Sequence, residues 1–405
     1  MVLKKDFRNI MFALGSILVI IFSCNQILFG QEKEAPKPSP IDVTGQVYMN
    51  WHVGLTDNSD KTGTKDSNTN TFELERIYLN FNKKFNDNFS AKVTLDIAND
   101  LMTESTTNSD GSEDTSTTTA TTKSSKYRVF LKFGYLQAKN SFGFVNTTIK
   151  AGMIDTPVSS LTNELSDQRY LHKNLIDDSK NLIATSIDNP ADMGLSIGLN
   201  FMKKADLTFA ITNGEGYKKT NESYYNDKND SSKNTSQGKA YYTKLTLMPI
   251  ETLYISGFCR YEGTSVNESD DHKGYYGAGI SWKNDLLKLG ANYLLPFQKK
   301  NGEDVTYTSS AGGGKKKLSI METWLTFTPK KLIQIPILAM ARYGFGKDLD
   351  KGDSMTTYMG IGIGYELDPN IRVAAWFDQY DSEAKDAANN PNPTRMFSIR
   401  TDIRL

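Results

Sequence analysis

The sequence is poor in cysteine and histidine, and after its N-terminus it has no long apolar run. It contains two Cys and three His among 405 residues, and its 47 basic residues balance its 47 acidic ones. No later segment approaches the roughly 20 apolar residues of a membrane-spanning helix, which excludes a helical membrane protein. The balanced charge gives no indication of a nucleic-acid partner. The three histidines have no nearby Ser or Cys motif typical of a nucleophile, so we expect neither an enzyme nor a cofactor.

The first 30 residues predict a secretion signal. They begin with a basic region formed by Lys4, Lys5 and Arg8. An apolar region follows at 10–22, and the small residue Gly30 then precedes a polar segment. We therefore expect a signal peptide at 1–30, a Pro-containing periplasmic leader at 31–41 and one folded domain at 42–405.

The two cysteines bear on how the N-terminus is processed. Residues 21–24, Ile-Phe-Ser-Cys, partly resemble a lipobox, so lipidation at Cys24 is the alternative to cleavage after Gly30. If Cys24 leaves with the signal peptide, Cys259 stands alone and no intramolecular disulfide can form.

The mature chain is dense in Tyr, Phe, Thr and Gly, and apolar residues occupy every second position of many segments. A period of two is the pattern of half-buried β-strands. Sixteen segments show it: 42–55, 71–85, 89–99, 127–139, 143–153, 191–202, 205–213, 239–248, 252–261, 273–282, 286–296, 318–328, 332–343, 355–367, 371–381 and 395–405. The pattern predicts an all-β fold.

The connections between these segments alternate strictly between short and long. Short turns fall at 86–88, 140–141, 203–204, 249–251, 283–285, 329–331 and 368–370. Long polar segments fall at 56–70, 100–126, 154–190, 214–238, 262–272, 297–317, 344–354 and 382–394. Outer-membrane barrels have short periplasmic turns and long external loops, whereas a soluble β-sandwich shows no such regularity. We therefore predict a sixteen-stranded antiparallel transmembrane β-barrel with both termini in the periplasm.

The two faces of each strand differ in character. The strand at 355–367 alternates Met359, Ile361 and Ile363 with glycines, and we expect the apolar set to face lipid. Aromatic residues of the apolar sets fall near the strand ends, as in the belts at membrane interfaces. Near the short turns these are Phe81, Tyr135, Phe201, Trp282, Phe327 and Tyr365, and near the long loops Trp51, Tyr261, Tyr293, Tyr343 and Phe377.

Several segments resemble the phosphate-selective porin O/P family and related porins. They are 72–81 (FELERIYLNF), 92–96 (KVTLD), 135–137 (YLQ), 149–153 (IKAGM) and 210–214 (AITNG). The resemblance covers most of the mature chain. It implies a sixteen-stranded, homotrimeric channel whose third loop is folded inward into the pore. Phosphate specificity is not implied, because in the family it depends on basic side chains concentrated at the constriction, and this third loop differs.

The candidate pore residues are of two kinds. They are charged residues at the alternate strand positions that face inward, and charged residues of the third loop, 154–190. Parity places five acidic residues inward: Asp96, Asp192, Glu322, Asp378 and Asp402. It places twelve basic residues inward: Arg76, Lys92, Arg128, Lys132, Lys150, Lys244, Arg260, Lys288, Arg342, Arg372, Arg400 and Arg404. The loop is net acidic, with Asp155, Glu164, Asp167, Asp177, Asp178 and Asp188 against Arg169, Lys173 and Lys180. A basic wall facing an acidic loop would give a transverse field.

We select ten of these residues as lining the narrowest part of the pore. They are Arg76, Lys92, Arg128, Lys132, Lys150, Asp155, Glu164, Asp167, Arg169 and Lys173. The carboxylates at 348–353 are spaced like a calcium loop, but the distal Glu of an EF-hand is missing, so we expect no metal.

The sequence thus predicts a porin in the outer membrane of a diderm bacterium. We expect passive diffusion of small hydrophilic solutes or ions with a mild anion preference, and contact with outer-membrane lipid. Two alternatives stay open: an adhesin or antigen that uses the long loops, and an outer-membrane hydrolase. For the hydrolase, no catalytic constellation can be assembled around His52 or His272.

Overall fold

The structure, a computed structural model, describes residues 40–55, 70–107, 119–174, 187–214, 216–217, 239–263, 272–300, 303–304, 318–349, 354–382 and 394–405. The predicted signal peptide, Cys24 and nearly all of the leader lie outside these residues. The described residues form sixteen long strands and one two-residue strand. The first eight are β1 (Asp42–Gly54), β2 (Asn70–Lys84), β3 (Phe89–Thr107), β4 (Thr119–Phe142), β5 (Val145–Asp155), β6 (Ala191–Phe201), β7 (Ala205–Thr212) and β8 (Ala240–Ile250). The others are β9 (Leu253–Gly263), β10 (His272–Lys283), β11 (Leu287–Lys300), β12 (Glu303–Asp304), β13 (Leu318–Phe327), β14 (Ile337–Asp348), β15 (Ser354–Asp368), β16 (Ile371–Ser382) and β17 (Thr394–Arg404).

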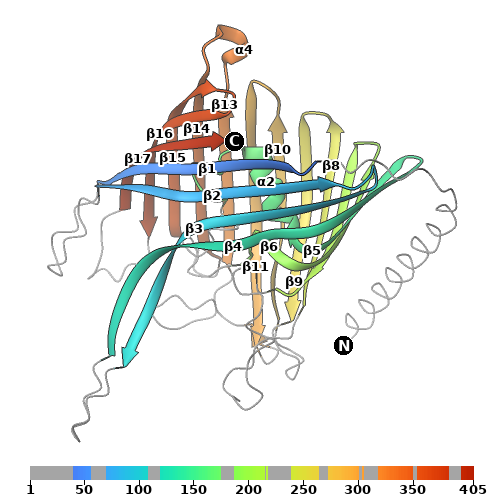
Figure 1. Ribbon diagram of the computed structural model, residues 1–405, viewed down its shortest axis with the longest axis horizontal. Helices are drawn as coiled ribbons and strands as arrows, with labels where there is room; N and C mark the ends of the chain where they lie inside the picture. Colours follow the sequence, from blue (N-terminus) through green and yellow to red (C-terminus); the bar gives the residue numbers. More distant parts are fainter. Residues whose placement is uncertain are drawn as a thin grey trace, which may run out of the picture. The chain divides into compact units, whose positions relative to one another are not determined.

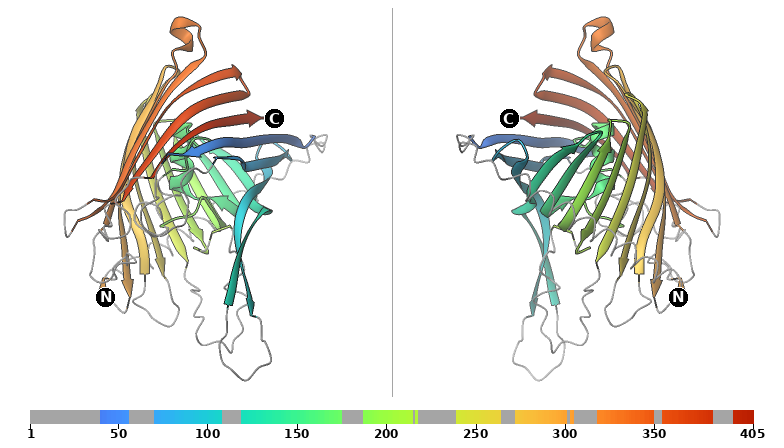
Figure 2. Two further views of the ribbon diagram at one scale, coloured as in Figure 1. Left: turned by 90° about the vertical axis from the view of Figure 1, so that its left-hand side faces the viewer. Right: turned by 90° about the vertical axis from the view of Figure 1, so that its right-hand side faces the viewer.

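The strands close into one antiparallel barrel. Each long strand pairs with its neighbours in sequence, and β1 pairs with both β2 and β17. Tyr48 of β1 therefore lies opposite Arg76 on one side and Asp402 on the other. Closure gives each long strand of the described residues a partner on both sides, which is a condition for a sheet in lipid. The predicted sixteen-stranded antiparallel barrel is confirmed (Figures 1 and 2).

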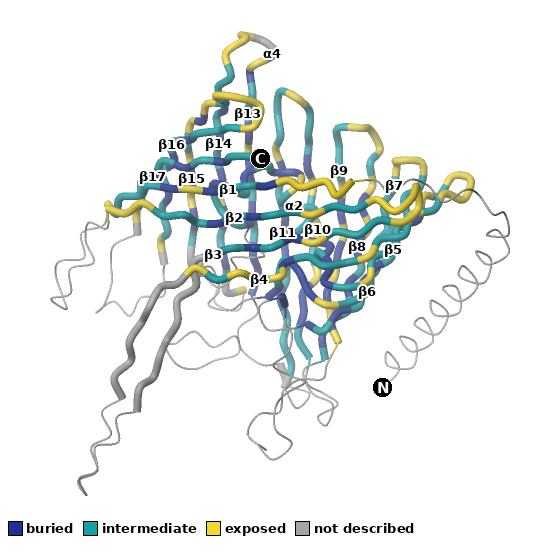
Figure 3. The backbone as a smooth tube through the Cα atoms, viewed as in Figure 1, coloured by how far each residue is buried: buried dark blue, intermediate teal, exposed yellow. Residues whose placement is uncertain are grey.

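The barrel wall is apolar outside and polar inside. On β15, Ile361 and Ile363 are 56% and 65% exposed, whereas Tyr358 is fully buried. The same alternation of exposed and buried positions follows the described strands around the wall (Figure 3). Buried charged residues are numerous and include Arg76, Asp96, Lys132, Arg260, Glu262, Glu322, Arg342, Asp378, Arg400 and Asp402. A water-soluble protein would bury the apolar face, so the wall is that of a transmembrane barrel and places the chain in an outer membrane.

Five of the eleven aromatic residues that strand parity places on the outer face are exposed, whereas Tyr135 is placed there wrongly and lies inside, with Lys150 over its ring. Near the short turns the exposed ones are Phe81 and Tyr365, and toward the long loops Tyr261, Tyr293 and Tyr343. Rings at these heights suit the two interfaces between lipid and water. Among the described residues, no helix is both long and apolar enough to cross a membrane.

The hairpin of β3 and β4 is longer than predicted. The sequence analysis assigns 100–126 to a polar loop, but pairing continues without a break from Asn99 opposite Tyr127 to Thr107 opposite Thr119. The extension is rich in Thr, whose branched side chain favours extended backbone. It has no apolar alternation in sequence, and the period-two pattern therefore misses it.

The turn between β13 and β14 also differs from the one predicted from the sequence. Sequence periodicity predicts a strand from 332, but the short helix α4 (Lys330–Ile333) intervenes and β14 begins at Ile337. Gln334 ends this helix in the left-handed conformation, with φ 57°. Pro336 has no amide hydrogen for a strand ladder, which delays the start of β14.

Candidate functional site

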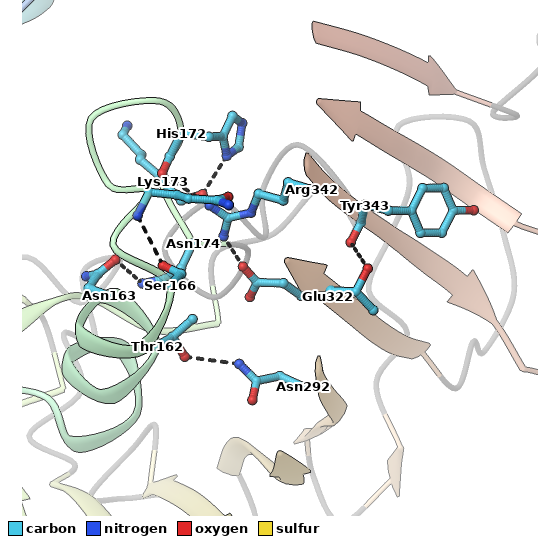
Figure 4. A network of polar contacts seen from close by, with 12 residues as sticks. Thr162, Asn163, Ser166, His172, Lys173, Asn174, Asn292, Glu322, Arg342 and Tyr343 are labelled. Atoms are coloured by element: carbon cyan, nitrogen blue, oxygen red, sulfur yellow. Dashed lines mark hydrogen bonds and ion pairs between the residues drawn. The ribbon is translucent and has the colours of Figure 1, made fainter. Parts of the chain in front are cut away.

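The candidate site is the interior of the barrel, where part of the segment between β5 and β6 lies. Helix α2 (Pro157–Ser166) begins with a proline, which suits a first helical turn. It ends at Asp167, in the left-handed conformation with φ 54°. The helix contacts β7, β8, β11 and β13, and Asn292 of β11 donates a hydrogen bond to Thr162 Oγ1 at 3.0 Å. Figure 1 shows α2 among the strands, and the close-up in Figure 4 shows the contact with Asn292.

Residues 167–174 continue from α2 along the inner face of β13 to β17. Gln168 Nε2 donates to the carbonyl of Leu325 at 2.7 Å and to Thr326 Oγ1 at 2.9 Å. Arg400 donates to the carbonyl of Leu171, and Tyr170 packs in a buried cluster with Met340, Trp376 and other inward residues. We call residues 156–174 the inner segment. Its side chains are fixed by the wall at several points, so it has a defined place in the lumen.

His172 anchors the end of the inner segment to β15 and β16. Its ring lies 4.3 Å from that of Tyr358 and it forms a hydrogen bond with Tyr380. Arg342 donates to the His172 carbonyl at 3.3 Å (Figure 4). Burial, helped by the positive charge of Arg342, lowers the pKa of His172 well below its ordinary value. The imidazole is therefore neutral at physiological pH and serves as an aromatic and polar contact.

Asp167 joins the inner segment to three cations of the wall. Its carboxylate accepts from Lys288 at 2.7 Å and from Arg372 at 2.9 Å, and Arg404 lies 3.6 Å away. Burial alone would raise the pKa of Asp167, but Arg372 and Lys288 outweigh it and hold the pKa below its ordinary value. The carboxylate therefore stays ionised and paired with the wall.

Asp188 anchors the chain to the barrel wall just before β6 begins. Its two oxygens accept from Tyr242 at 2.9 Å and Tyr275 at 2.5 Å, and Arg260 lies 3.6 Å away. Burial raises the pKa of Asp188 to about 6, even though Arg260 and the two hydroxyls favour the charged form. The free-energy cost of removing the carboxylate from water thus exceeds the stabilisation that these partners give to its charged form.

The raised pKa of Asp188 predicts a pH-dependent stability. Because the folded-state pKa lies above the ordinary 3.8, ionisation opposes folding, and stability should fall as the pH rises from 3.8 to about 6. Asp188→Asn should remove a contribution on the order of 3 kcal/mol from this window. Urea unfolding of both proteins in detergent between these pH values measures the slope, with exposed Asp87→Asn as the control. Equal slopes for Asp188→Asn and the unchanged protein would contradict the assignment.

Most arginines of the inner wall are paired with carboxylates of the wall. Arg76 lies 2.6 Å from Asp96, Arg400 lies 3.0 Å from Asp378, and Arg404 lies 2.9 Å from Asp402. Arg260 pairs with Glu262 and Arg342 with Glu322. The sequence predicts a basic wall, but the inward residues do not form a uniform one. Neighbouring carboxylates neutralise much of the positive charge of these arginines.

Four inward lysines lie on β3, β4, β5 and β8, and we call them the lysine row: Lys92, Lys132, Lys150 and Lys244. Of these, Lys150 is paired with a carboxylate, that of Asp155. Lys132 donates to the hydroxyl of Tyr78 at 3.0 Å and lies 4.3 Å from its ring centre. Lys92 lies 5.5 Å from the ring centre of Phe133. The charge of Lys92 interacts with those of Asp155, Lys150 and Lys132, and that of Lys244 with those of Asp206, Asp155, Glu164 and Lys150. Three of the four, Lys92, Lys132 and Lys150, lie over aromatic rings.

The structure brings some predicted site residues together and separates others. Lys150 is paired with Asp155 at 2.5 Å, and both interact electrostatically with Lys244, as does Glu164. Arg169 acts on the hydroxyls of Tyr48 and Tyr78, so it is electrostatically linked to the wall of the lysine row. Arg128 is half-buried on β4, and Lys173 is half-buried in the inner segment.

Of the ten residues, Asp167 lies in another part of the lumen, and Arg76 stays near Lys132 but is held in an ion pair. Asp167 binds Lys288 and Arg372 of the far wall instead of facing the lysine row. Arg76 is held by Asp96 and by Tyr217, which follows β7. The sequence did not reveal Tyr78 and Tyr135 as partners of the lysines. Tyr78 of β2 meets Lys132 of β4, two strands away, and the irregularity in β4 near Lys132 turns Tyr135 inward against its predicted parity.

No protein-family model matches the chain, and no curated protein matches its sequence. Solved structures do match its fold. The anion-selective porin of Comamonas acidovorans aligns with a TM-score of 0.58 at 9% identity, over 91% of this chain and 100% of that one. OmpF of Salmonella typhi, in a complex with daunomycin, aligns with a TM-score of 0.56 at 11% identity, over 91% and 100%. The outer-membrane channel DcaP of Acinetobacter baumannii aligns with a TM-score of 0.53 at 13% identity, over 92% and 99%.

The closed barrel, its apolar outer face and these alignments define a sixteen-stranded β-barrel with the fold of outer-membrane porins. The particular phosphate-selective O/P family is not among the proteins named by these matches.

Proposed function

We propose that this barrel is a porin through which small hydrophilic solutes and ions diffuse passively, with a mild preference for anions. The observation that carries the proposal is the polar inner face, with its charged side chains inside a closed barrel. Charged groups in a lumen need water or partners, and a wet lumen open at both ends conducts.

The passage runs between the inner segment and the wall of β2 to β5. The inner segment is fixed against β11 to β17 through Thr162, Gln168 and Leu171, and α2 also contacts β8, the strand of Lys244. The other three lysines of the row lie on β3 to β5. A pore selects by its width and by the charges at its narrowest part. The segment sets the width, and the lysine row favours anions, while the paired arginines contribute little net field.

The homotrimer implied by the sequence resemblance stays a prediction. Discrete conductance steps in a planar lipid bilayer test the channel itself. Folded protein that inserts and gives no steps would overturn the proposal in favour of an adhesin or a hydrolase.

The lysine row predicts the ion selectivity. Combined Lys92→Gln, Lys132→Gln and Lys150→Gln should lower the chloride-to-potassium permeability ratio by about threefold or more, because screening limits selectivity to charges within about 10 Å of the ion. Reversal potentials across a KCl gradient give the ratio. Lys204→Gln, in a short turn outside the barrel wall, is the matched control. A ratio unchanged by the triple substitution would show that other charges govern the passage.

A further inference from the structure

A cavity of about 430 Å³ lies at the short-turn end of the lumen, beneath the inner segment. Asp167 and Tyr170 of the inner segment form one side of it. The wall side includes Lys283, Lys288, Met340 and Arg372, from β10, β11, β14 and β16. Its volume is in the range of pockets that hold small organic molecules.

The cavity already contains a carboxylate that belongs to the chain. The carboxylate of Asp167 is paired with the cations of Lys288 and Arg372, and we call these two residues the clasp. The side chain of Lys288 is 21% exposed and that of Arg372 is 15% exposed. Arg372 keeps one more donor, because its Nε is buried and, among the described residues, has no hydrogen-bond partner. Lys283 donates to the carbonyl of Glu164 at 3.2 Å, a contact that leaves its positive charge in place.

Two further carboxylates line the cavity, so its acidic side chains equal its basic ones in number. Glu366 faces Lys330 at 3.6 Å, and Asp285 belongs to the turn that follows Lys283. The remaining lining mixes the polar Asn284, Thr326 and Thr328 with Tyr254 and a small apolar surface, where Leu338 and Met340 lie beside Tyr170. A cationic clasp next to an apolar surface suits a ligand with one carboxylate and a compact apolar body.

We propose that this cavity binds small organic carboxylates at the Lys288–Arg372 clasp, and that Asp167 is a built-in competitor for the same cations. The inference rests on the proposed porin function for its meaning, since it names a class of solute that would be retained on its way through the lumen. The ligand carboxylate takes the place of Asp167, and its apolar part packs on Met340 and Tyr170.

Calorimetric titration of the detergent-purified barrel with sodium benzoate tests the site, with benzyl alcohol as the neutral probe of similar size. Benzoate should bind at low ionic strength and benzyl alcohol should not. Arg372→Met and Lys288→Met should each weaken benzoate binding about tenfold, the effect of one lost charge-assisted hydrogen bond. Asp167→Asn should strengthen binding by about the same factor, because it removes the competing charge.

Lys204→Met is the matched control, because Lys204 also donates to a backbone carbonyl, that of Pro249, and lies outside the cavity. It should leave benzoate binding unchanged. Equal binding of benzoate and benzyl alcohol, or an Asp167→Asn variant that binds benzoate no more tightly, would overturn the proposal. Circular dichroism verifies that each variant is folded.

The calorimetric result is independent of conductance. A barrel that conducts without binding benzoate would keep the porin function and lose the site. A barrel that binds benzoate without conducting would keep the site and lose the porin function.

Discussion

Arg342→Met should lower the free energy of unfolding by about 3–5 kcal/mol, because it leaves a buried carboxylate without its partner. The side chain of Glu322 is fully buried and that of Arg342 is 1% exposed, and the two form an ion pair between β13 and β14. Arg342 also donates to the His172 carbonyl, so the same substitution loosens the inner segment. Urea unfolding in detergent micelles measures the loss.

Two further variants isolate the buried charge as the cause. Lys84→Met breaks an exposed pair with Asp87, whose side chains are 62% and 95% exposed, and should cost less than about 1 kcal/mol. Arg342→Met combined with Glu322→Met should be less destabilising than Arg342→Met alone, since no unpaired charge remains. If Arg342→Met is no worse than Lys84→Met, the buried pair does not stabilise the barrel.

Replacing residues 160–172 by a short Gly-Ser linker should raise the single-channel conductance about twofold or more, since pore width limits the flow of ions. These residues include most of α2 and the contacts of Gln168 and Leu171 with the wall. Their removal should open the passage beside the lysine row. Recording in planar bilayers measures the change.

Asn86→Ala, in the short turn between β2 and β3, is the control for this deletion and should conduct like the unchanged protein. A folded deletion variant with unchanged conductance would show that the inner segment does not limit the passage.

The fold could be predicted from sequence because the membrane imposes a simple rule on each strand. Lipid outside and water inside force the alternation seen at Met359, Ile361 and Ile363, so strand positions follow from parity. Where this constraint ends, the prediction fails. The extension of β3 and β4 to Thr107 and Thr119 has no apolar alternation, and its Thr-rich sequence is equally compatible with a loop.

The charge pairing could be predicted only in part. Arg260 and Glu262 are two residues apart, so parity could have placed both inside, although the sequence analysis omitted Glu262. Glu75 lies at a β-bulge, where Tyr48 pairs with Arg76 and Met49 with Leu74, and it reaches 3.8 Å from Arg400. A bulge shifts the parity by one residue, and nothing in the local sequence reveals it.

The contacts of the inner segment could likewise be predicted only in part. Its length and apolar residues, such as Tyr170 and Leu171, indicate that it packs against something. The partners of Asp167 lie 121 and 205 residues away in sequence, at Lys288 and Arg372. Such pairings depend on how far the segment crosses the lumen, which strand spacing alone does not determine.

The central claim is that ions pass through the lumen beside the lysine row, and a cysteine at Lys150 tests it most directly. Lys150→Cys is made in a chain whose Cys24 and exposed Cys259 are replaced by serine. Tyr343→Cys, 44% exposed on the outer face, is the control. A bulky, water-soluble thiol reagent should lower the single-channel conductance of Lys150→Cys and leave that of Tyr343→Cys unchanged. Absence of channels, or equal conductance of modified and unmodified Lys150→Cys, would contradict the account.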